Sequence, residues 1–397
     1  MICPRLLIVG NFISSSGCSR GVCEELAPRL RASGWSVLTT SHRRSRPARL
    51  MDMLYTVWKR RHEFDLAQVD VYSGPSFLWA EAVCCLLRRL DRPYVLTLHG
   101  GNLPNFARTA SRRVAALLNS AAVVTVPSSY LLNQMRAYRR NLILLPNGLD
   151  LSAYGHMVRR PVQPHLVWLR AFHQIYNPAM APRVIARLKK EFPAIRLTMA
   201  GPDKGDSSRE ATIATAKQYC VESHLEMQGA LPKQSVPCFL SAGDIFLNTS
   251  RIDNTPVSVL EAMAAGMCVV STDPGGIPYL LNNEQDALLV PVDDDIAMAE
   301  AVRRLLTDPA LADRIQSAAL AKVRNFAWSL VLPQWQTLLT AVATGSLSDA
   351  GPMPDNFTRQ GHIRTIQRPQ DAETCGTATK PAVNAFISLK KNPDPDE

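Results

Sequence analysis

Short runs of apolar and β-branched residues alternate along this chain with longer amphipathic stretches, and the whole alternation occurs twice. The first series of predicted strands is Leu6–Val9, Val37–Thr40, Ala67–Val71, Tyr94–Leu98, Val123–Val126 and Leu142–Leu145. The second series is Leu166–Leu169, Arg196–Met199, Leu225–Met227, Ile245–Asn248, Cys268–Ser271 and Ala287–Val290. Strands separated by helix-length segments are typical of a parallel, doubly wound sheet. The chain is therefore predicted to be α/β, with two such sheets in tandem.

The length of 397 residues agrees with two Rossmann-like domains, since one core commonly serves ~150 to 200 residues. The break should fall within residues 147–164, where prolines and glycines cluster without periodicity. We predict an N-terminal domain over 1–160, a C-terminal domain over 161–328, a terminal helix over 329–344 and a disordered tail over 345–397. Ligands of such sheets bind beyond the carboxyl ends of the strands, so the cleft between two facing domains is the expected active site.

Composition excludes several classes of protein. With 46% hydrophobic and 20% charged residues the chain is globular, and its longest apolar run, Phe77–Leu87, is too short to span a bilayer, which takes ~20 residues. The apolar run that follows Arg5 is also short for a signal peptide, so we expect a cytoplasmic protein. The nine cysteines include no Cys-x-x-Cys pair and no histidine at metal spacing. They are predicted to be reduced, mostly buried thiols that form neither disulfides nor a metal site.

Positive charge is concentrated in the first half of the chain. Residues 1–150 have a net charge of +11 and the remainder −1, and seven basic residues lie between His42 and His62. They enclose apolar residues at helical spacing, a pattern that suits a helix lying on anionic lipid headgroups, at the inner face of a membrane. A surface helix whose apolar stripe packs on its own domain fits equally well. No nucleic-acid-binding motif accompanies the charge, so nucleic acid is not an expected partner.

The segment 244–276 carries most of the functional information. A predicted strand runs into a polar turn, Thr255 is placed as the N-cap, Pro256 at the first helical position, and Gly266 at the end of the helix. The backbone N–H groups at Val257, Ser258 and Val259 should then point into the cleft, at the positive end of the helix dipole. Such an arrangement predicts a phosphate site.

Two carboxylates flank this helix start. Asp253 precedes it and Glu261 lies within the helix. A carboxylate repels a phosphate, so the natural ligands of both side chains are hydroxyl groups, as on a ribose and a sugar ring. The alternative for Glu261 is a solvated carboxylate on an exposed helix face.

At this point the sequence resembles a known family, the retaining glycosyltransferases of GT-B fold called glycosyl transferases group 1, or GT4-type. The resemblance rests on Asp253-x7-Glu261 together with Pro256, Gly266 and Gly275–Gly276. It extends in order of elements over about residues 6–335. One departure is the first carboxylate, which is Asp where the family usually has Glu.

The resemblance implies a fold, a reaction and roles for residues. It implies two facing Rossmann-like domains, a nucleoside-diphosphate sugar as donor substrate, transfer with retention at the anomeric carbon, and no required metal or cofactor. Glu261 would hold the donor ribose, and Asp253 would face the donor sugar. Pro256, Val257 and Ser258 would lie at the donor diphosphate.

The leaving diphosphate needs positive charge. The family usually supplies an Arg and a Lys after the first strand of the second domain; here Arg170 ends that strand, but no Lys follows it. We expect Lys204, after the next strand, to provide the second charge. The alternative for Arg170 is an ion pair with Asp203 or Asp206.

Three further positions complete the predicted site. The segment ending at Leu231 matches the place where the family's backbone meets the nucleotide base. The loop 10–21 is rich in small residues, and the resemblance places Gly17 beside the donor phosphates; the loop lacks a Gly-x-Gly-x-x-Gly or P-loop motif. His99 follows a strand and precedes two glycines, so it should emerge at the cleft and contact the donor sugar or the developing charge.

The residues and the resemblance together indicate a retaining, metal-independent glycosyltransferase. It would move a sugar from a nucleoside-diphosphate sugar to a hydroxyl of a sugar or lipid-linked acceptor, in polysaccharide or glycolipid assembly. His99, Arg170 and Asp253 are the predicted catalytic residues. The alternatives are a nucleotide-sugar epimerase of the same architecture and a catalytically degenerate scaffold.

Overall fold

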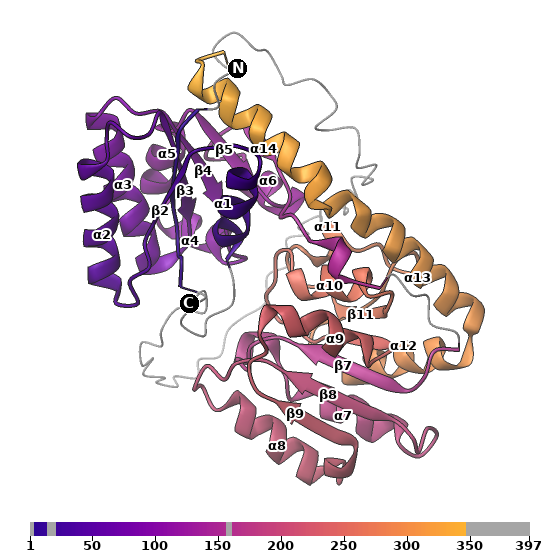
Figure 1. Cartoon of the computed structure of the whole chain (residues 1–397). Helices are drawn as coiled ribbons and strands as arrows, with labels where there is room; N and C mark the ends of the chain where they lie inside the picture. The colour runs from indigo at the N-terminus through magenta and orange to yellow at the C-terminus, as the bar shows by residue number, and fades with distance from the viewer. Residues whose placement is uncertain (1–3, 14–20, 156–160, 347–397) are drawn as a thin grey trace, which may run out of the picture.

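The computed structural model describes residues 4–13, 21–155 and 161–346, and within them the chain forms two parallel six-stranded sheets (Figure 1). The first sheet has the order β2-β1-β3-β4-β5-β6, with strands β1 (Leu6–Val9), β2 (Val37–Thr40), β3 (Leu66–Val71), β4 (Tyr94–Leu98), β5 (Val123–Val126) and β6 (Leu142–Leu144). The second has the order β12-β11-β10-β7-β8-β9, with strands β7 (His165–Leu169), β8 (Arg196–Ala200), β9 (Leu225–Gln228), β10 (Ile245–Asn248), β11 (Cys268–Thr272) and β12 (Leu288–Val290). The predicted α/β class and the doubled parallel sheet are confirmed. The predicted tail lies outside the described residues from 347 onward.

Helices connect the strands and cover both sheets. Those of the first domain are α1 (Val22–Ala32), α2 (Arg46–Lys59), α3 (Phe77–Arg89), α4 (Leu103–Thr109), α5 (Ser111–Asn119) and α6 (Ser129–Met135). Those of the second are α7 (Met180–Leu188), α8 (Ser208–Gln218), α9 (Val236–Ser241), α10 (Val257–Ala264), α11 (Ile277–Leu280), α12 (Asp295–Thr307) and α13 (Pro309–Val323). A last helix, α14 (Trp328–Ala343), follows.

Burial on both faces explains why the strand sequences are nearly continuous apolar runs. All residues of β1 are buried, and all six residues of β3 are buried although Gln68 and Asp70 are polar. The pair of strands is in register from Leu6 opposite Leu66 onward. Buried polar side chains need hydrogen-bond partners, and Gln68 and Asp70 find theirs in each other and in His99, at the candidate site.

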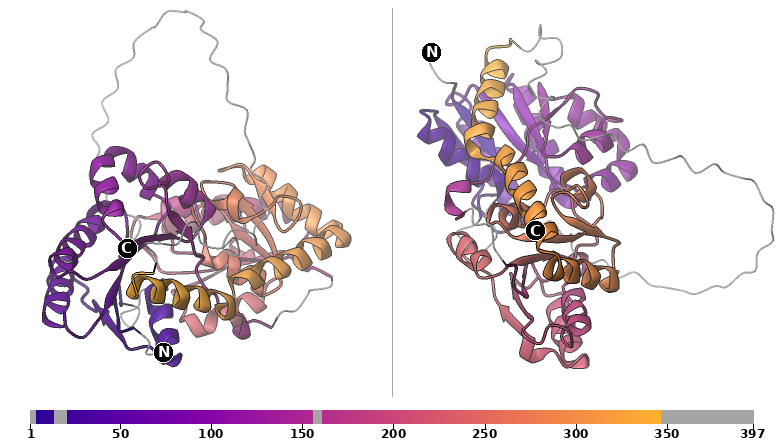
Figure 2. Two further views of the ribbon diagram at one scale, coloured as in Figure 1. Left: turned by 90° about the horizontal axis from the view of Figure 1, so that it is seen from above. Right: turned by 90° about the vertical axis from the view of Figure 1, so that its right-hand side faces the viewer.

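The chain crosses between the domains twice, and the two crossings lie side by side. Leu149 N–H donates to the carbonyl of Phe326 over 2.7 Å, and Trp328 N–H donates to the carbonyl of Leu149 over 3.1 Å. After the second crossing α14 runs back along the first domain (Figures 1 and 2), where Val331, Trp335 and Leu338 share a core with residues of β1. This helix, which comes last among the described ones, therefore helps to complete the core of the first domain.

Candidate active site between the two domains

A cavity of about 250 Å3 lies where the two domains face each other. The first domain contributes the loop after β4, beginning at His99, and the second contributes Arg170 after β7 and the turn 252–255 after β10. All three segments follow the carboxyl ends of parallel strands, which is where such sheets bind ligands. The structure thus brings the three predicted catalytic residues, His99, Arg170 and Asp253, to one cavity.

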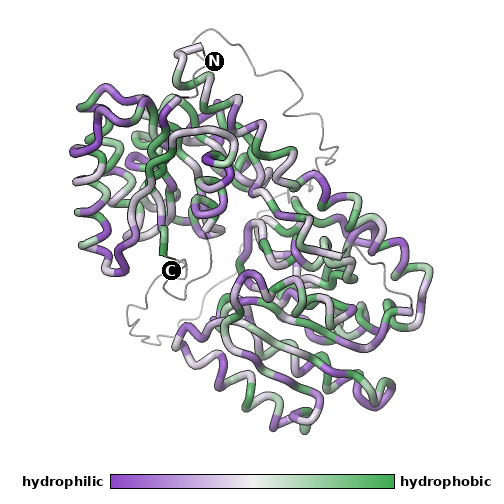
Figure 3. Tube along the Cα trace, viewed as in Figure 1, coloured by the Kyte–Doolittle hydropathy of each residue, from purple (hydrophilic) through white to green (hydrophobic). Residues whose placement is uncertain are grey.

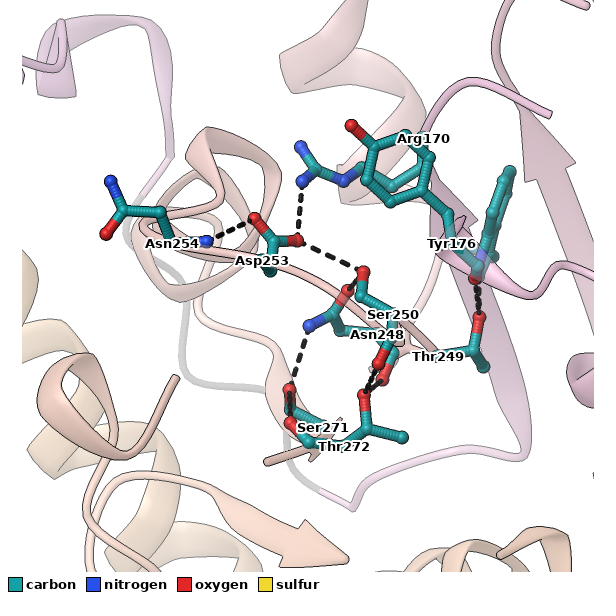
Figure 4. A network of polar contacts seen from close by, with 10 residues as sticks. Arg170, Tyr176, Asn248, Thr249, Ser250, Asp253, Asn254, Ser271 and Thr272 are labelled. Carbon is teal, nitrogen blue, oxygen red and sulfur yellow. Dashed lines mark hydrogen bonds and ion pairs between the residues drawn. The ribbon is translucent and has the colours of Figure 1, made fainter. Parts of the chain in front are cut away.

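Arg170 and Asp253 form an ion pair across this part of the cavity (Figure 4). Arg170 Nη2 lies 2.5 Å from Asp253 Oδ2, and the guanidinium carbon lies 4.3 Å from the centre of the Tyr176 ring. Burial disfavours the charged form of Arg170, but the Asp253 carboxylate outweighs this and raises the pKa of the guanidinium. The alternative pairing of Arg170 with Asp203 or Asp206 is wrong, since Asp206 instead accepts from the N–H of Gln174.

Hydrogen bonds and two glycines fix the turn that carries Asp253. Its Oδ2 accepts from Ser250 Oγ at 3.1 Å and its Oδ1 from the N–H of Asn254 at 3.0 Å (Figure 4). A Cβ at Gly276 would lie 2.1 Å from the carbonyl oxygen of Asn254, and one at Gly275 would lie 2.5 Å from that of Asp253. Only residues without a side chain allow this approach, which explains the Gly275–Gly276 pair.

The turn also touches the first domain. Ser128 Oγ donates to Asn254 Oδ1 over 2.5 Å, and a Cβ at Gly101 would lie 3.3 Å from the carbonyl carbon of Asp253. The segment next to the Asp253 carboxylate is therefore positioned by both domains.

The helix start differs by one residue from the prediction. Pro256, not Thr255, is the N-cap, because its backbone is extended (ψ 118°), and α10 begins at Val257. Thr255 Oγ1 does not cap the helix; it and Ser258 Oγ are buried without a hydrogen-bond partner, as is Arg170 Nε. The N–H groups of Val257 and Ser258 head the helix, where no intrahelical acceptor exists for them. Several buried donors thus surround the start of α10, as the phosphate hypothesis requires.

Glu261 is enclosed rather than solvated. It is 4% exposed and accepts from the Tyr154 hydroxyl at 3.1 Å and from the Lys233 ammonium. Burial, followed by the charge of Glu261, raises the pKa of Tyr154 well above its ordinary value, so the phenol keeps its proton and donates it. The alternative of an exposed helix-face carboxylate is wrong.

The imidazole of His99 contacts a buried carboxylate, that of Asp70. Its Nε2 lies 3.0 Å from Asp70 Oδ1, and its ring stacks on Tyr72 with centroids 5.0 Å apart. Gln68 Nε2 donates to the same Asp70 oxygen at 2.8 Å, while Asp70 Oδ2 has no hydrogen-bond partner. The arrangement fixes the orientation of the imidazole at the edge of the cavity.

Two family models match the chain. The model described as Glycosyltransferase Family 4 matches residues 20–153, and the one described as Glycosyl transferases group 1 matches residues 165–322. Together they cover the second sheet, every strand of the first sheet except β1, and the site residues His99, Arg170, Asp253 and Glu261. The chain belongs to the GT4-type glycosyltransferases.

Relatives agree with this family, and solved structures share its fold. The phosphatidyl-myo-inositol mannosyltransferase of Mycobacterium tuberculosis is 24% identical over 72% of this chain and 76% of its own length. The teichuronic acid biosynthesis glycosyltransferase TuaC of Bacillus subtilis, a putative assignment, is 27% identical over 53% of this chain and 54% of its own. Among structures, sucrose-phosphate synthase of Thermosynechococcus elongatus has a TM-score of 0.71 at 17% identity, covering 86% of this chain and 100% of that one. Anabaena HepE in complex with UDP-glucose has a TM-score of 0.69 at 16% identity, covering 85% and 100%. These likenesses confirm the GT-B fold.

The remaining residues that were predicted to bind the donor of this glycosyltransferase do not all lie at the candidate site. Leu231 is half-buried after β9, near Lys233, whereas Lys204 is exposed on the loop after β8 and does not line the cavity. Gly17 lies outside the described residues. Sequence reasoning missed Lys233 and Tyr154. The sequence offered one signal for Lys233: it follows closely after the segment, ending at Leu231, that is expected at the nucleotide base.

The structure also bears on the cysteine, metal and membrane predictions for this glycosyltransferase. Cys23, Cys84 and Cys268 are buried, but Cys220 and Cys238 are exposed, so the expectation of mostly buried thiols holds for only part of the described set. The described residues contain no cluster of three or more His, Cys, Asp or Glu side chains that could hold a metal ion. None of the described helices is long and apolar enough to cross a membrane.

Proposed function

We propose that this chain is a retaining glycosyltransferase that moves a sugar from a nucleoside-diphosphate sugar to an acceptor hydroxyl, without a metal ion, in polysaccharide or glycolipid assembly. One observation carries the proposal: Arg170 Nε, Thr255 Oγ1 and Ser258 Oγ are buried donors without partners around the start of α10. A buried donor left unpaired costs about 1–3 kcal/mol. A diphosphate would supply acceptors for these groups and for the first N–H groups of the helix.

The geometry supports a separate role for each site residue. Arg170 and the start of α10 would stabilise the charge that develops on the leaving diphosphate. Asp253 Oδ2, which accepts from both Arg170 and Ser250, is suited to accept from a donor-sugar hydroxyl once the phosphates engage Arg170. Glu261 would accept from the ribose hydroxyls, and His99 would meet the sugar from the first domain.

For the transfer step, the acceptor oxygen would attack the anomeric carbon while the bond from that carbon to the diphosphate oxygen breaks. The acceptor proton would pass to the departing phosphate oxygen on the same face, which retains the configuration. This step assigns no nucleophilic role to Asp253, whose carboxylate is paired with Arg170.

The relatives support the donor and acceptor classes. HepE is described in complex with UDP-glucose, and the mycobacterial relative is named for a phosphatidylinositol acceptor. We infer an acceptor that is a lipid-linked or polymer-bound sugar or polyol. Both family models describe glycosyltransferases, so they give the epimerase alternative no support.

Thermal stabilisation by UDP, GDP, ADP and their sugar conjugates tests the proposal. A nucleotide at a hundred times its dissociation constant should stabilise the wild type by ~2.7 kcal/mol and leave Glu261→Ala unchanged. Transfer should persist in EDTA, and the anomeric configuration of the product should match that of the donor. If no nucleotide stabilises the wild type, the scaffold alternative replaces the enzyme.

A further inference from the structure

Helix α2 has apolar residues on two faces. Leu50, Met53 and Val57 pack against the core of the first domain. Met51, Tyr55 and Trp58 lie at i, i+4 and i+7 on another face and are 65%, 55% and 55% exposed. One apolar stripe therefore packs inward, as the surface-helix interpretation predicts, and a second stripe faces solvent. We call Met51, Tyr55 and Trp58 the outer stripe.

The outer stripe is unusual within this molecule. Of the nine large apolar side chains that are exposed within the described ranges, three lie on this one helix face. A fourth, Leu78, lies in the first turn of the neighbouring helix α3. Single exposed apolar residues need no explanation, but an aligned set of them marks a surface that binds another protein, a ligand or a membrane.

The charges around the outer stripe have one dominant sign. Arg46 at the start of α2 and Lys59 at its end are exposed, as is Arg43 in the preceding loop. The one acidic residue of α2, Asp52, is turned toward the end of β2, where it accepts from Ser41 Oγ at 2.5 Å. Beyond the helix Glu63 is exposed, but it is paired with Arg60.

The aromatic residues of the stripe lie close to cations. Lys59 Nζ is 5.2 Å from the Tyr55 ring centre, and the Arg61 guanidinium carbon is 5.2 Å from that of Trp58. Tyr and Trp beside basic groups are the residues favoured at the boundary between lipid headgroups and acyl chains. A neutral protein partner would not need this basic rim.

We propose that the outer stripe of α2 docks the protein on an anionic lipid bilayer. Met51, Tyr55 and Trp58 enter the headgroup region, and Arg46 and Lys59 contact lipid phosphates. In two views α2 lies on the flank of the first domain remote from the second domain (Figures 1 and 2), so a docked bilayer meets the first domain alone. The colouring by hydropathy shows apolar and polar residues interleaved along the same helix (Figure 3).

Co-flotation of the full chain with vesicles tests this inference. The probes are vesicles of phosphatidylcholine alone and of equal parts phosphatidylcholine and phosphatidylglycerol. The wild type should float with the anionic vesicles, less in high salt, and little with the neutral ones. Arg46→Gln with Lys59→Gln should weaken binding at least tenfold, since each basic residue contributes about fivefold. Met51→Ser with Tyr55→Ser and Trp58→Ser should weaken it at least as much.

A matched control comes from the second domain. Ile296 is 63% exposed and Lys217 is also exposed, so Ile296→Ser with Lys217→Gln removes similar groups elsewhere and should leave flotation unchanged. Equal flotation of the wild type and the outer-stripe variants would overturn the inference. So would a wild-type dimer in solution that those variants convert to monomer, which would assign the stripe to a second copy of the chain.

The inference does not depend on the donor site. The outer-stripe variants should keep the thermal stabilisation by nucleotide that the wild type shows, which also proves that they fold. Loss of flotation with retained nucleotide binding supports docking. Flotation of a wild type that binds no nucleotide would overturn the proposed function and leave the docking surface standing.

Discussion

Arg170 and Asp253, which come from the ends of β7 and β10, neutralise each other in the cleft with 2.5 Å between Nη2 and Oδ2. A donor diphosphate would have to share this guanidinium with Asp253. The pair therefore keeps Asp253 oriented before the donor binds, and it holds the Arg170 guanidinium beside the site proposed for the diphosphate.

The first prediction concerns this ion pair. Arg170→Met leaves Asp253 buried without its counter-ion and should lower stability by about 2 kcal/mol. The loss should be smaller than for a fully enclosed pair, because the Arg170 side chain is 20% exposed. Transfer should fall ~100-fold or more, as for loss of a donor to a developing anion. Denaturant unfolding and initial rates measure the two effects.

A remote ion pair provides the control. Arg304 and Glu284 pair on the surface of the second domain, where both side chains are more than two-fifths exposed. Arg304→Met should change stability by less than about 1 kcal/mol and leave transfer unaltered. An equal loss of activity in both variants would mean that the Arg170 effect is unspecific.

The second prediction separates two lysines. Lys233 contacts Glu261, whereas Lys204 is exposed outside the described cavity. Lys233→Ala should weaken nucleotide binding about tenfold, because Glu261 loses a charged partner that holds its carboxylate in place. Lys204→Ala is the comparison, with isothermal titration as the measurement. A larger loss with Lys204→Ala would restore that residue as the second phosphate ligand.

Features that depend on local sequence patterns, namely the strands and the residues at their ends, were predicted from the sequence. Alternating apolar runs defined the strands to within about a residue, and strand ends placed His99, Arg170 and Asp253 at one cleft. Lys233 and Tyr154 escaped prediction because only tertiary packing brings them to Glu261, from 28 and 107 positions away.

The cap of α10 and the packing of α14 also depended on more than the local sequence pattern. The sequence predicted Thr255 as the N-cap. The N-cap is instead Pro256, because the backbone of Pro256 is extended, with ψ of 118°. Likewise the sequence pattern predicted a terminal helix over 329–344, observed as Trp328–Ala343, but not the surface it packs on, since any apolar surface satisfies an amphipathic stripe.

The third prediction tests the close approach behind the Asp253 turn. Gly276→Ala places a Cβ 2.1 Å from the carbonyl oxygen of Asn254 and must displace the turn. We expect a loss of about 1–3 kcal/mol in stability and weaker nucleotide binding. A Cβ at Gly229 would meet nothing within 4 Å, so Gly229→Ala should leave stability nearly unchanged. Equal melting temperatures for Gly276→Ala and the wild type would contradict the geometry.

The fourth prediction concerns thiol reactivity. Burial raises the pKa of Cys84 to about 12, and burial followed by the charge of Asp70 raises that of Cys23, so both remain protonated near neutral pH. At pH 8, iodoacetamide should modify Cys220 and Cys238 in the native protein and leave Cys23 and Cys84 intact, as read by peptide mass spectrometry. A raised folded pKa favours the protonated native state, so the contribution of Cys84 to stability is complete below about pH 9 and declines toward pH 12. Modification of native Cys84 at pH 8 would show that its helix opens.

The fifth prediction assigns a positioning role to Asp70. Its Oδ1 lies 3.0 Å from His99 Nε2, and it contacts neither Arg170 nor the start of α10 among the described contacts. Asp70→Asn should therefore lower kcat about tenfold through a misoriented His99, with little change in KM or in stabilisation by nucleotide. Thr125→Val is a control for general loosening: Thr125 Oγ1 donates to Thr97 Oγ1 over 3.1 Å, and Thr97 Oγ1 in turn accepts from Gln68, the other partner of Asp70. If both variants lose stability equally and keep kcat, Asp70 supports the core rather than the imidazole; a fall in kcat confined to Asp70→Asn requires that His99 orientation matters for transfer.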